Sequence, residues 1–169
     1  MDFQMRSMTE EDGSLICEWR YPPPYDRYRW LSWEQMKREM REFGDPAIRA
    51  AQYRSVRSGR DDELIAYVQL FPLDRAVRIG LGLRPDLCGC GHGGAVIRLA
   101  VQEALRCKPR PDAEIDLEVE TWNKRAIRAY EKAGFVPESR YDRQAEHGVV
   151  QVLCMVWQPS ASAPKGEKA

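Results

Sequence analysis

Four glycines stand within six residues of this chain, at positions 89, 91, 93 and 94. An apolar, strand-like run ends just before them at Pro85, and a helical pattern begins at Gly94. Glycine leaves the backbone N–H groups at such a helix start uncovered, and hydrogen bonds together with the helix dipole stabilise a phosphate there. The segment therefore predicts a site for a ligand that carries phosphate groups.

The same segment allows two other interpretations. Its glycines have the GxGxxG spacing of dinucleotide-binding folds, but those folds place the glycines after their first strand, and several strand-like runs precede them here. Cys88, Cys90 and His92 could ligate a metal ion, yet their spacing is tighter than that of a zinc CxxC knuckle, and no second ligand pair follows. We expect no metal, and a dinucleotide-binding protein is the third of our functional interpretations.

Carboxylates and a capped helix follow further along the chain. Residues 114–121 alternate strictly between apolar and acidic side chains, which places Glu118 and Glu120 on one face of a predicted strand. Asn123 then caps a helix predicted over residues 124–133. A strand end with acidic side chains and a helix start are thus expected to lie close together.

The remaining pattern indicates an α+β fold with a mixed, mostly antiparallel sheet. Short turns join the first strands, which favours an antiparallel meander, and a strand–helix–strand unit follows. We predict strands over residues 2–8, 48–56, 63–71, 75–83, 114–121, 135–140 and 149–157, and helices over residues 9–20, 32–43, 94–107 and 124–133. One domain is expected over residues 1–158, with a disordered Ser/Ala/Pro/Lys-rich tail over residues 159–169.

Composition excludes several classes of protein. Lys and Arg together number 26, as do Asp and Glu, so the balanced charge gives no reason to expect nucleic acid as a partner. The five cysteines contain no CxxC pair, which favours a reducing cytoplasm over a disulfide framework. The first residues lack the features of a signal peptide, and no apolar run is long enough to cross a membrane.

Two segments together resemble the GNAT superfamily of acyl-CoA-dependent N-acetyltransferases. Residues 81–94 are similar to the family's acyl-CoA motif Arg/Gln-x-x-Gly-x-Gly/Ala, with Cys88 in the place of Arg or Gln. Residues 117–135 are similar to its strand–Asn–helix–Tyr–Gly-Phe signature. The resemblance covers about residues 1–157, and it implies a single-domain fold with helices on both faces of the sheet and acetyl-CoA as cosubstrate.

The resemblance also implies roles for individual residues. Tyr130 would donate a proton to the departing CoA thiolate, and Glu118 would act as the base, with Glu120 as the alternative. A structural partnership with an arginine, or a solvated strand face, is the other interpretation of Glu118. Arg84 or Lys132 would compensate for the absence of the family's Arg or Gln at position 88, where this chain has Cys88. The residues expected to bind acetyl-CoA are Leu81, Leu83, Cys88, Gly89, Cys90, Gly91, His92, Gly93, Gly94, Asn123, Ala126 and Tyr130.

The segment between the first two predicted helices is rich in aromatic and proline residues. In the resembling family this region often borders the acceptor site, so we expect Tyr21, Tyr25, Asp26 and Tyr28 to contact the substrate. Rings and arginines there would suit an aromatic or anionic acceptor. The alternative is that these rings simply cover the sheet.

The resemblance predicts an enzyme that moves an acetyl group from acetyl-CoA to a primary amine by direct attack in a ternary complex. The acceptor would be a small molecule or a peptide amine. The alternative is a catalytically inactive CoA-binding sensor or scaffold. The closing strands leave room for pairing in a homodimer.

Overall fold

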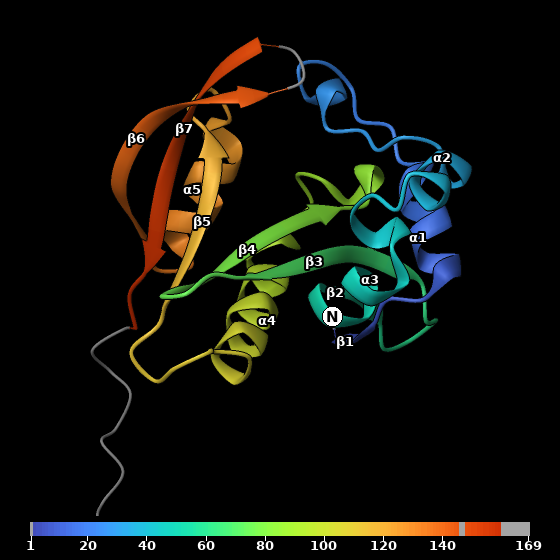
Figure 1. Cartoon of the computed structure of the whole chain (residues 1–169), viewed down its shortest axis with the longest axis horizontal. Coiled ribbons are helices and arrows are strands. Elements are labelled where there is room, and N and C mark those ends of the chain that lie inside the picture. Colours follow the sequence, from blue (N-terminus) through green and yellow to red (C-terminus); the bar gives the residue numbers. More distant parts are fainter. Residues whose placement is uncertain (1, 146–147, 160–169) are drawn as a thin grey trace, which may run out of the picture.

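The computed structural model describes residues 2–145 and 148–159 (Figure 1). Almost all of the tail predicted over residues 159–169 therefore lies outside the described residues. The strands are β1 (Phe3–Ser7), β2 (Tyr53–Ser58), β3 (Leu64–Pro72), β4 (Ala76–Leu83), β5 (Glu114–Glu120), β6 (Phe135–Ala145) and β7 (Gly148–Trp157). The helices are α1 (Glu10–Cys17), α2 (Trp33–Arg38), α3 (Pro46–Gln52), α4 (Gly93–Arg106) and α5 (Lys124–Lys132).

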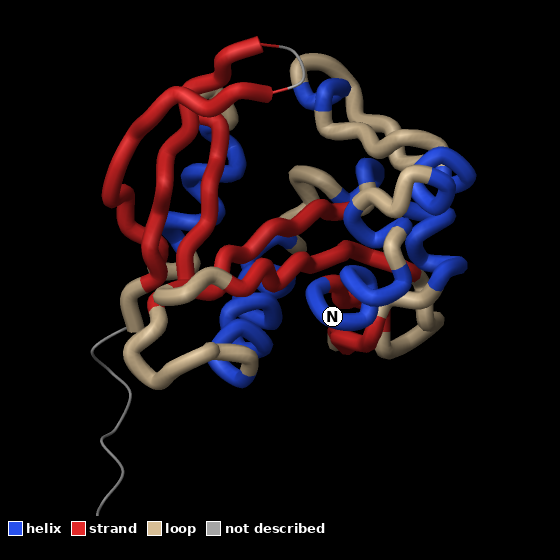
Figure 2. The backbone as a smooth tube through the Cα atoms, in the orientation of Figure 1, coloured by secondary structure: helices blue, strands red, loops and turns tan. Residues whose placement is uncertain are grey.

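The strands of the described residues form one sheet of seven, in the order β1-β2-β3-β4-β5-β7-β6. Neighbouring strands run antiparallel except β4 and β5, which run parallel. This confirms the predicted α+β fold with a mixed, mostly antiparallel sheet. The parallel strands pair only over Ala76–Arg78 and Glu114–Asp116. Beyond that they separate, and Figure 2 shows β5, β6 and β7 leaning away from β3 and β4.

Helices cover both faces of the sheet, as predicted, and each face has its own core. One core packs α4 and α5 against the sheet, and its buried members include Val68, Ile79, Val96, Ile97 and Leu117. The other core packs α1 and α2 against the opposite face around Ile16, Met36, Phe43 and Tyr53. No helix of the described residues combines the length and the hydropathy needed to cross a membrane.

Helix α1 is fixed at its start. Thr9 accepts a hydrogen bond from the Asp12 N–H (3.1 Å), and the Asp12 carboxylate accepts one from the Thr9 N–H (3.0 Å), and these two bonds form a capping box. Asp12 also accepts hydrogen bonds from Ser55 (2.7 Å) and Arg57 on β2. Burial would raise the pKa of Asp12, but these hydrogen bonds and the Arg57 charge outweigh it and lower the pKa. The carboxylate therefore holds α1, and the loop after it, on the sheet.

The strand predicted over residues 48–56 is wrong in its first half, where the chain forms α3. Asp45 caps this helix, because its carboxylate accepts hydrogen bonds from the N–H groups of Ala47 (2.7 Å) and Ile48 (3.3 Å). Pro46 stands at the first helical position, where its missing N–H would have no partner anyway. A carboxylate followed by proline is thus a helix start here, in the gap between the predicted helix over residues 32–43 and the predicted strand.

Two predicted helices are shorter than expected. The helix predicted over residues 9–20 ends at Cys17, and the one predicted over residues 32–43 ends at Arg38. Met40 has a left-handed backbone with φ of 50°, which interrupts the second helix. The loop between α1 and α2 is therefore long, and it reaches across the sheet to the site described next.

Candidate active site

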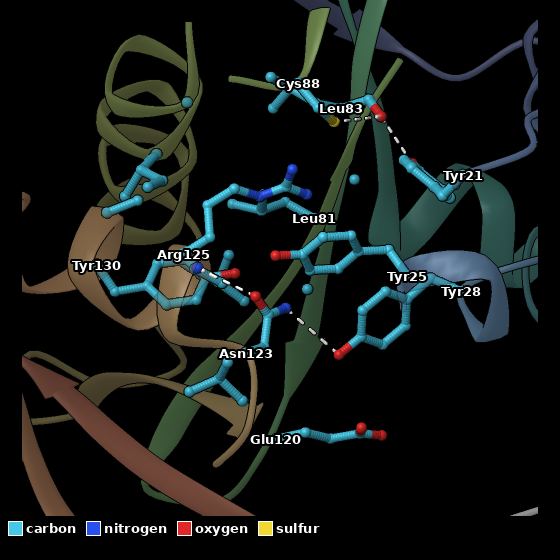
Figure 3. Close-up of a pocket in the computed structure, with 18 of the residues that line it drawn as sticks. Tyr21, Tyr25, Tyr28, Leu81, Leu83, Cys88, Glu120, Asn123, Arg125 and Tyr130 are labelled. Atoms are coloured by element: carbon cyan, nitrogen blue, oxygen red, sulfur yellow. Dashed lines mark hydrogen bonds between the residues drawn. The ribbon is translucent and has the colours of Figure 1, made fainter. Parts of the chain in front are cut away.

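A pocket opens where β4 and β5 separate. Its volume is about 1040 Å³, at the upper end of the roughly 300–1,000 Å³ typical of ligand sites. The glycine loop, β4, β5, α5 and the loop between α1 and α2 all contribute to its lining. Figure 3 shows Tyr25 and Tyr28 entering from the side of that loop, opposite Arg125 and Tyr130 of α5. Two groups of elements therefore face each other across one cavity.

The glycine loop forms one wall of this pocket. Gly89 and Gly91 have left-handed backbones with φ of 82° and 85°, a conformation that glycine adopts without a steric penalty. A Cβ atom added at either position would meet no atom within 4 Å, so the space over the loop is open. No side chain caps the start of α4, which follows directly. The loop has the uncovered amides and the helix N-terminus that phosphate binding requires.

Only part of the loop faces the pocket. Cys90 and His92 do not line it: Cys90 is exposed, and the His92 ring packs edge-on against Phe3 at 5.7 Å between ring centroids. Among the described residues, no three His, Cys, Asp or Glu side chains are grouped as a metal site requires. The loop residues that line the pocket are Cys88, Gly89, Gly91, Gly93 and Gly94.

The edge of β4 forms the second wall. The Arg84 N–H bonds to the Ile65 carbonyl of β3 (2.8 Å), and successive residues of a strand direct their N–H and C=O groups to opposite edges. The backbone groups of Leu81 and Leu83 therefore point toward the gap left by β5. The Leu83 carbonyl already accepts a hydrogen bond from the Tyr21 hydroxyl (2.6 Å). Leu81 is thus the better placed of the two for a ligand in the gap.

Four cationic side chains border the half of the pocket around the glycine loop and α5. None of them takes part in a salt bridge among the described residues. This half of the pocket therefore carries a net positive charge, which suits a polyanionic ligand. The four are Arg98, Arg125, Arg128 and Lys132.

The structure indicates which cation is placed to substitute for the family's Arg or Gln, which is Cys88 in this chain. Arg84 pairs with Asp86 (2.8 Å) and Glu63 (3.1 Å), and it does not line the pocket. Arg125 lies near the loop instead: burial raises the pKa of the Cys88 thiol, and the Arg125 charge opposes that rise. Arg125, which is not among the residues predicted to compensate at position 88, is better placed than Arg84 to contact a phosphate at the loop.

Helix α5 brings its predicted residues into the pocket. The Asn123 side-chain oxygen accepts a hydrogen bond from the Ala126 N–H (3.2 Å), and its amide donates one to the Tyr28 hydroxyl (3.4 Å). Asn123 is thus both the predicted helix cap and the link between α5 and the α1–α2 loop (Figure 3). Ala126 and Tyr130 also line the pocket, and the Tyr130 ring packs edge-on against Phe135.

Glu118 lines the pocket but is engaged on both of its oxygens. Oε1 accepts hydrogen bonds from Arg78 of β4 and from the Tyr141 hydroxyl of β6, and Oε2 accepts one from Arg143 (2.6 Å). Arg78 in turn holds Asp116 through two hydrogen bonds of 3.0 and 2.7 Å. The structure therefore places Glu118 in the arginine partnership that was the alternative to its role as base.

Glu120 has fewer hydrogen-bond partners than Glu118. Its Oε2 accepts hydrogen bonds from the Trp122 ring nitrogen and from Arg27 (3.1 Å). Its Oε1 accepts none from the described part of the protein, and the carboxylate lies near Asn123 and Tyr28 in Figure 3. Of the two carboxylates, Glu120 is the one with an oxygen available to a substrate.

The aromatic loop closes the pocket from the side opposite α5. The Tyr28 ring stacks on Trp122 at 5.8 Å between centroids, and the Arg125 guanidinium lies 4.0 Å from the centre of the Tyr25 ring. Tyr21 is anchored on β4, as described above. Asp26, by contrast, is exposed and does not line the pocket, so the structure separates it from the other three predicted substrate residues.

A family comparison accounts for this arrangement. The model of the Acetyltransferase (GNAT) family matches residues 14–135, which is more than half of the chain and includes both the glycine loop and α5. The chain belongs to the GNAT acetyltransferase family. It is accordingly an N-acetyltransferase that uses acetyl-CoA, and the function predicted from the two segments is confirmed at this level.

Solved structures with the GNAT fold agree with the architecture. Spermidine N-acetyltransferase from Vibrio cholerae in complex with CoA and spermine is 17% identical, and the alignment covers 91% of this chain and 95% of that one with a TM-score of 0.70. A dodecameric structure of the same enzyme is 20% identical over 91% and 92% of the two chains, with a TM-score of 0.67. At such identities the likeness shows the fold alone. No curated protein sequence matches this chain significantly.

Some lining residues of this GNAT pocket escape prediction from the sequence. Arg27 lines the pocket because the α1–α2 loop folds onto the end of β5, where its guanidinium lies over the Trp122 ring, and no local pattern indicates that contact. Gly80 and Gly82 do leave a signal, because two alternate glycines within a strand often mark a place where another group approaches the backbone closely. The two glycines therefore indicate a binding surface on the face of β4 that the α1–α2 loop covers.

Proposed function

We propose that the pocket binds acetyl-CoA and a primary amine together, and that the amine attacks the thioester directly. The observation that carries this proposal is the separation of β4 from β5 beside a loop of uncovered amides. The pyrophosphate would bind at the glycine loop, and the pantetheine arm would follow the exposed backbone edge at Leu81. A volume of about 1040 Å³ supports simultaneous binding of the arm and an acceptor.

The charge of the pocket supports this direction of binding. Four of the five lining cations that form no salt bridge among the described residues lie at the end formed by the glycine loop and α5, where the phosphates of CoA would lie; the fifth, Arg29, lies on the α1–α2 loop. The carboxylates that line the pocket, Glu118 and Glu120, lie at the other end on β5. The phosphates and the amine would therefore approach from opposite ends, and the thioester would lie between them.

Glu120 is our assignment for the base, in place of the first choice made from the sequence. In the reaction the amine nitrogen bonds to the acetyl carbon and becomes far more acidic, so a carboxylate oxygen or a water bound to it can accept the released proton. Glu120 has an available oxygen, whereas both oxygens of Glu118 accept hydrogen bonds. The N–H of Leu81, at the edge of the gap, would stabilise the oxyanion of the tetrahedral intermediate.

Tyr130 is our assignment for the acid. As the carbon–sulfur bond breaks, the electron pair goes to sulfur, and the phenol donates a hydrogen bond and then its proton to the thiolate. Burial raises the pKa of Tyr130 above its ordinary value of 10.0, and the neighbouring phenols of Tyr67 and Tyr28 add to the rise. The phenol therefore stays protonated at neutral pH, which is the form that a proton donor needs.

Thiol release from acetyl-CoA in the presence of an amine panel tests the proposal. We expect Tyr130→Phe to lower kcat by about 100-fold, the scale of general acid catalysis, and to leave acetyl-CoA affinity within about 2-fold. The matched control is Tyr53→Phe. Tyr53 is buried and does not line the pocket, and the substitution removes only its hydroxyl group, which donates a hydrogen bond to Glu42 (2.6 Å). Because the Tyr130 pKa is raised, wild-type activity should persist through pH of about 10, where an ordinary phenol loses its proton.

Two results would contradict the proposal in different ways. A Tyr130→Phe variant as active as the parent would remove the acid role from this residue. Binding of acetyl-CoA without acetylation of any amine would instead favour the CoA-binding module without catalysis. Thermal stabilisation by acetyl-CoA, measured alongside, separates these cases because a ligand stabilises only a protein that binds it.

A further inference from the structure

Two glycines of β4 form the floor of the acceptor half of the pocket, and the backbone is uncovered at one of them. Gly80 and Gly82 lie on the face of β4 that carries Arg78, and both line the pocket. A Cβ atom at Gly82 would lie 2.4 Å from the Tyr67 ring, so this ring occupies the space that a side chain would fill. A Cβ atom at Gly80 would meet only Gln69, at 3.4 Å. The space over Gly80 is therefore open, and it adjoins the strand edge where the thioester would lie.

Aromatic rings form the wall beside this floor. Trp19 and Trp30 lie against Tyr67, with ring centroids 6.1 and 5.9 Å from it, and all three line the pocket. The three side chains are half-buried, because they also cover the core around Phe43. Such a wall offers flat, apolar contacts to a ligand and favours stacked or edge-to-face packing with another ring.

Among the described residues that line it, the acceptor half of the pocket has no uncompensated negative charge. Glu118 is paired with Arg78 and Arg143, and Glu120 is paired with Arg27. Binding a ligand with several positive charges requires carboxylates that are not already neutralised, because charges moved out of water need partners. Arg27, Arg143 and Arg29 line the same half. A polyamine is therefore a poor fit to this pocket.

We infer that the acceptor is a primary amine attached to a flat aromatic ring, with no positive charge besides that of the amine. The ring would lie over Gly80 against Trp19, Trp30 and Tyr67, and the amine would point toward Glu120 and the thioester. This inference rests on the proposed function and names the substrate class of the same site.

Three amines distinguish the alternatives in an acetylation assay with the full chain. 2-Phenylethylamine and 2-cyclohexylethylamine carry the same aminoethyl group and differ in whether the ring is flat and aromatic, and spermidine is a polycation. We expect kcat/KM for the phenyl compound to exceed that of the cyclohexyl compound about 5-fold, as one favourable aromatic contact would give. Spermidine should be the poorest of the three. Equal values for the two ring compounds, or a preference for spermidine, would overturn the inference.

Substitutions of Gly80 and Trp19 test whether these residues bind the ring of the acceptor. Gly80→Ala should raise KM for 2-phenylethylamine about 10-fold and leave KM for acetyl-CoA unchanged, since a methyl group enters space that the fold leaves open. Trp19→Leu should bring the ratio of phenyl to cyclohexyl activity close to one. Trp33→Leu is the matched control, because Trp33 packs on Phe43 and does not line the pocket. An unchanged ratio in Trp19→Leu would overturn the inference.

Failure of the inference differs from failure of the proposed function. If spermidine is acetylated best, acetyl transfer stands and only the substrate class is wrong. If no amine is acetylated although acetyl-CoA binds, the proposed function is wrong and the substrate class with it.

Discussion

The half of the pocket around the glycine loop is built from main-chain amides and unpaired cations, whereas the half under the α1–α2 loop is built from aromatic rings and, apart from Arg29, from paired charges. Backbone amides recognise phosphate through local geometry, which a short run of glycines specifies. Rings and ion pairs recognise an acceptor through side chains that come from several strands and loops. A cosubstrate site can therefore persist across a family while the acceptor site changes from one member to the next.

The sharpest test of the first half is to block its amides. Gly91→Val places a β-branched side chain at φ of 85°, a left-handed conformation that such residues rarely adopt. The loop must shift, and losing two amide contacts to a charged group should weaken acetyl-CoA binding by about 100-fold or more. Calorimetry with acetyl-CoA measures this affinity.

Gly134→Ala is the control for this substitution. Gly134 also has a left-handed backbone, with φ of 94°, but it ends α5 and lies outside the pocket lining. The control should lower stability without lowering acetyl-CoA affinity. If Gly91→Val binds acetyl-CoA as the parent does, the amides around position 91 do not hold the pyrophosphate, and the contrast between the two halves fails.

The two carboxylates of β5 test the second half. Glu120→Gln should lower kcat by about 100-fold, the lower end of the range of general base catalysis, with KM for acetyl-CoA unchanged. Glu118→Gln should keep kcat within about 5-fold and lower the melting temperature instead, because it removes the charge opposite Arg78 and Arg143. Steady-state kinetics and thermal unfolding of both variants give the comparison. A larger loss of kcat in Glu118→Gln would return the base role to that residue.

The contrast also explains what could be predicted from the sequence. Strands and helices with strong local signals, such as β5 with its strict alternation and α5 with its Asn123 cap, are found at close to their predicted bounds. The glycine loop belongs with them, since its geometry depends on neighbours in the sequence. α3 is missed because Asp45 and Pro46 fit a helix stop as well as a helix start.

The acceptor half could not be predicted in the same way. Glu118 has the alternation and spacing expected of a catalytic base, yet its partners Arg78 and Arg143 come from two other strands. Asp26 is close in sequence to Tyr25 and Tyr28, yet it is exposed and does not line the pocket. Only the pairing of distant strands and the path of a long loop decide these contacts, and a single sequence holds no local record of them.

Arg125 lies between the two halves, and its removal should have a smaller effect than the substitutions of Gly91 and Glu120. Its guanidinium lies over the ring of Tyr25 in the α1–α2 loop. It also lies near Cys88, which stands in the place of the family's Arg or Gln. If it contacts a CoA phosphate in place of that side chain, Arg125→Gln should raise KM for acetyl-CoA about 10-fold, the worth of one charge-assisted hydrogen bond, with little change in kcat. Arg84→Gln is the control, since Arg84 is held by Asp86 outside the pocket.

Restoring the family residue makes the test specific. In the double variant Cys88→Arg, Arg125→Gln, an arginine returns to the loop, and KM for acetyl-CoA should fall back toward that of the parent. A structural role of Arg125 at Tyr25 would predict no such rescue, because the new side chain would stand on the loop and not on α5. If the double variant keeps the raised KM, Arg125 acts by positioning the α1–α2 loop through Tyr25 and does not contact a phosphate. Arg125 would then belong to the acceptor half of the pocket alone.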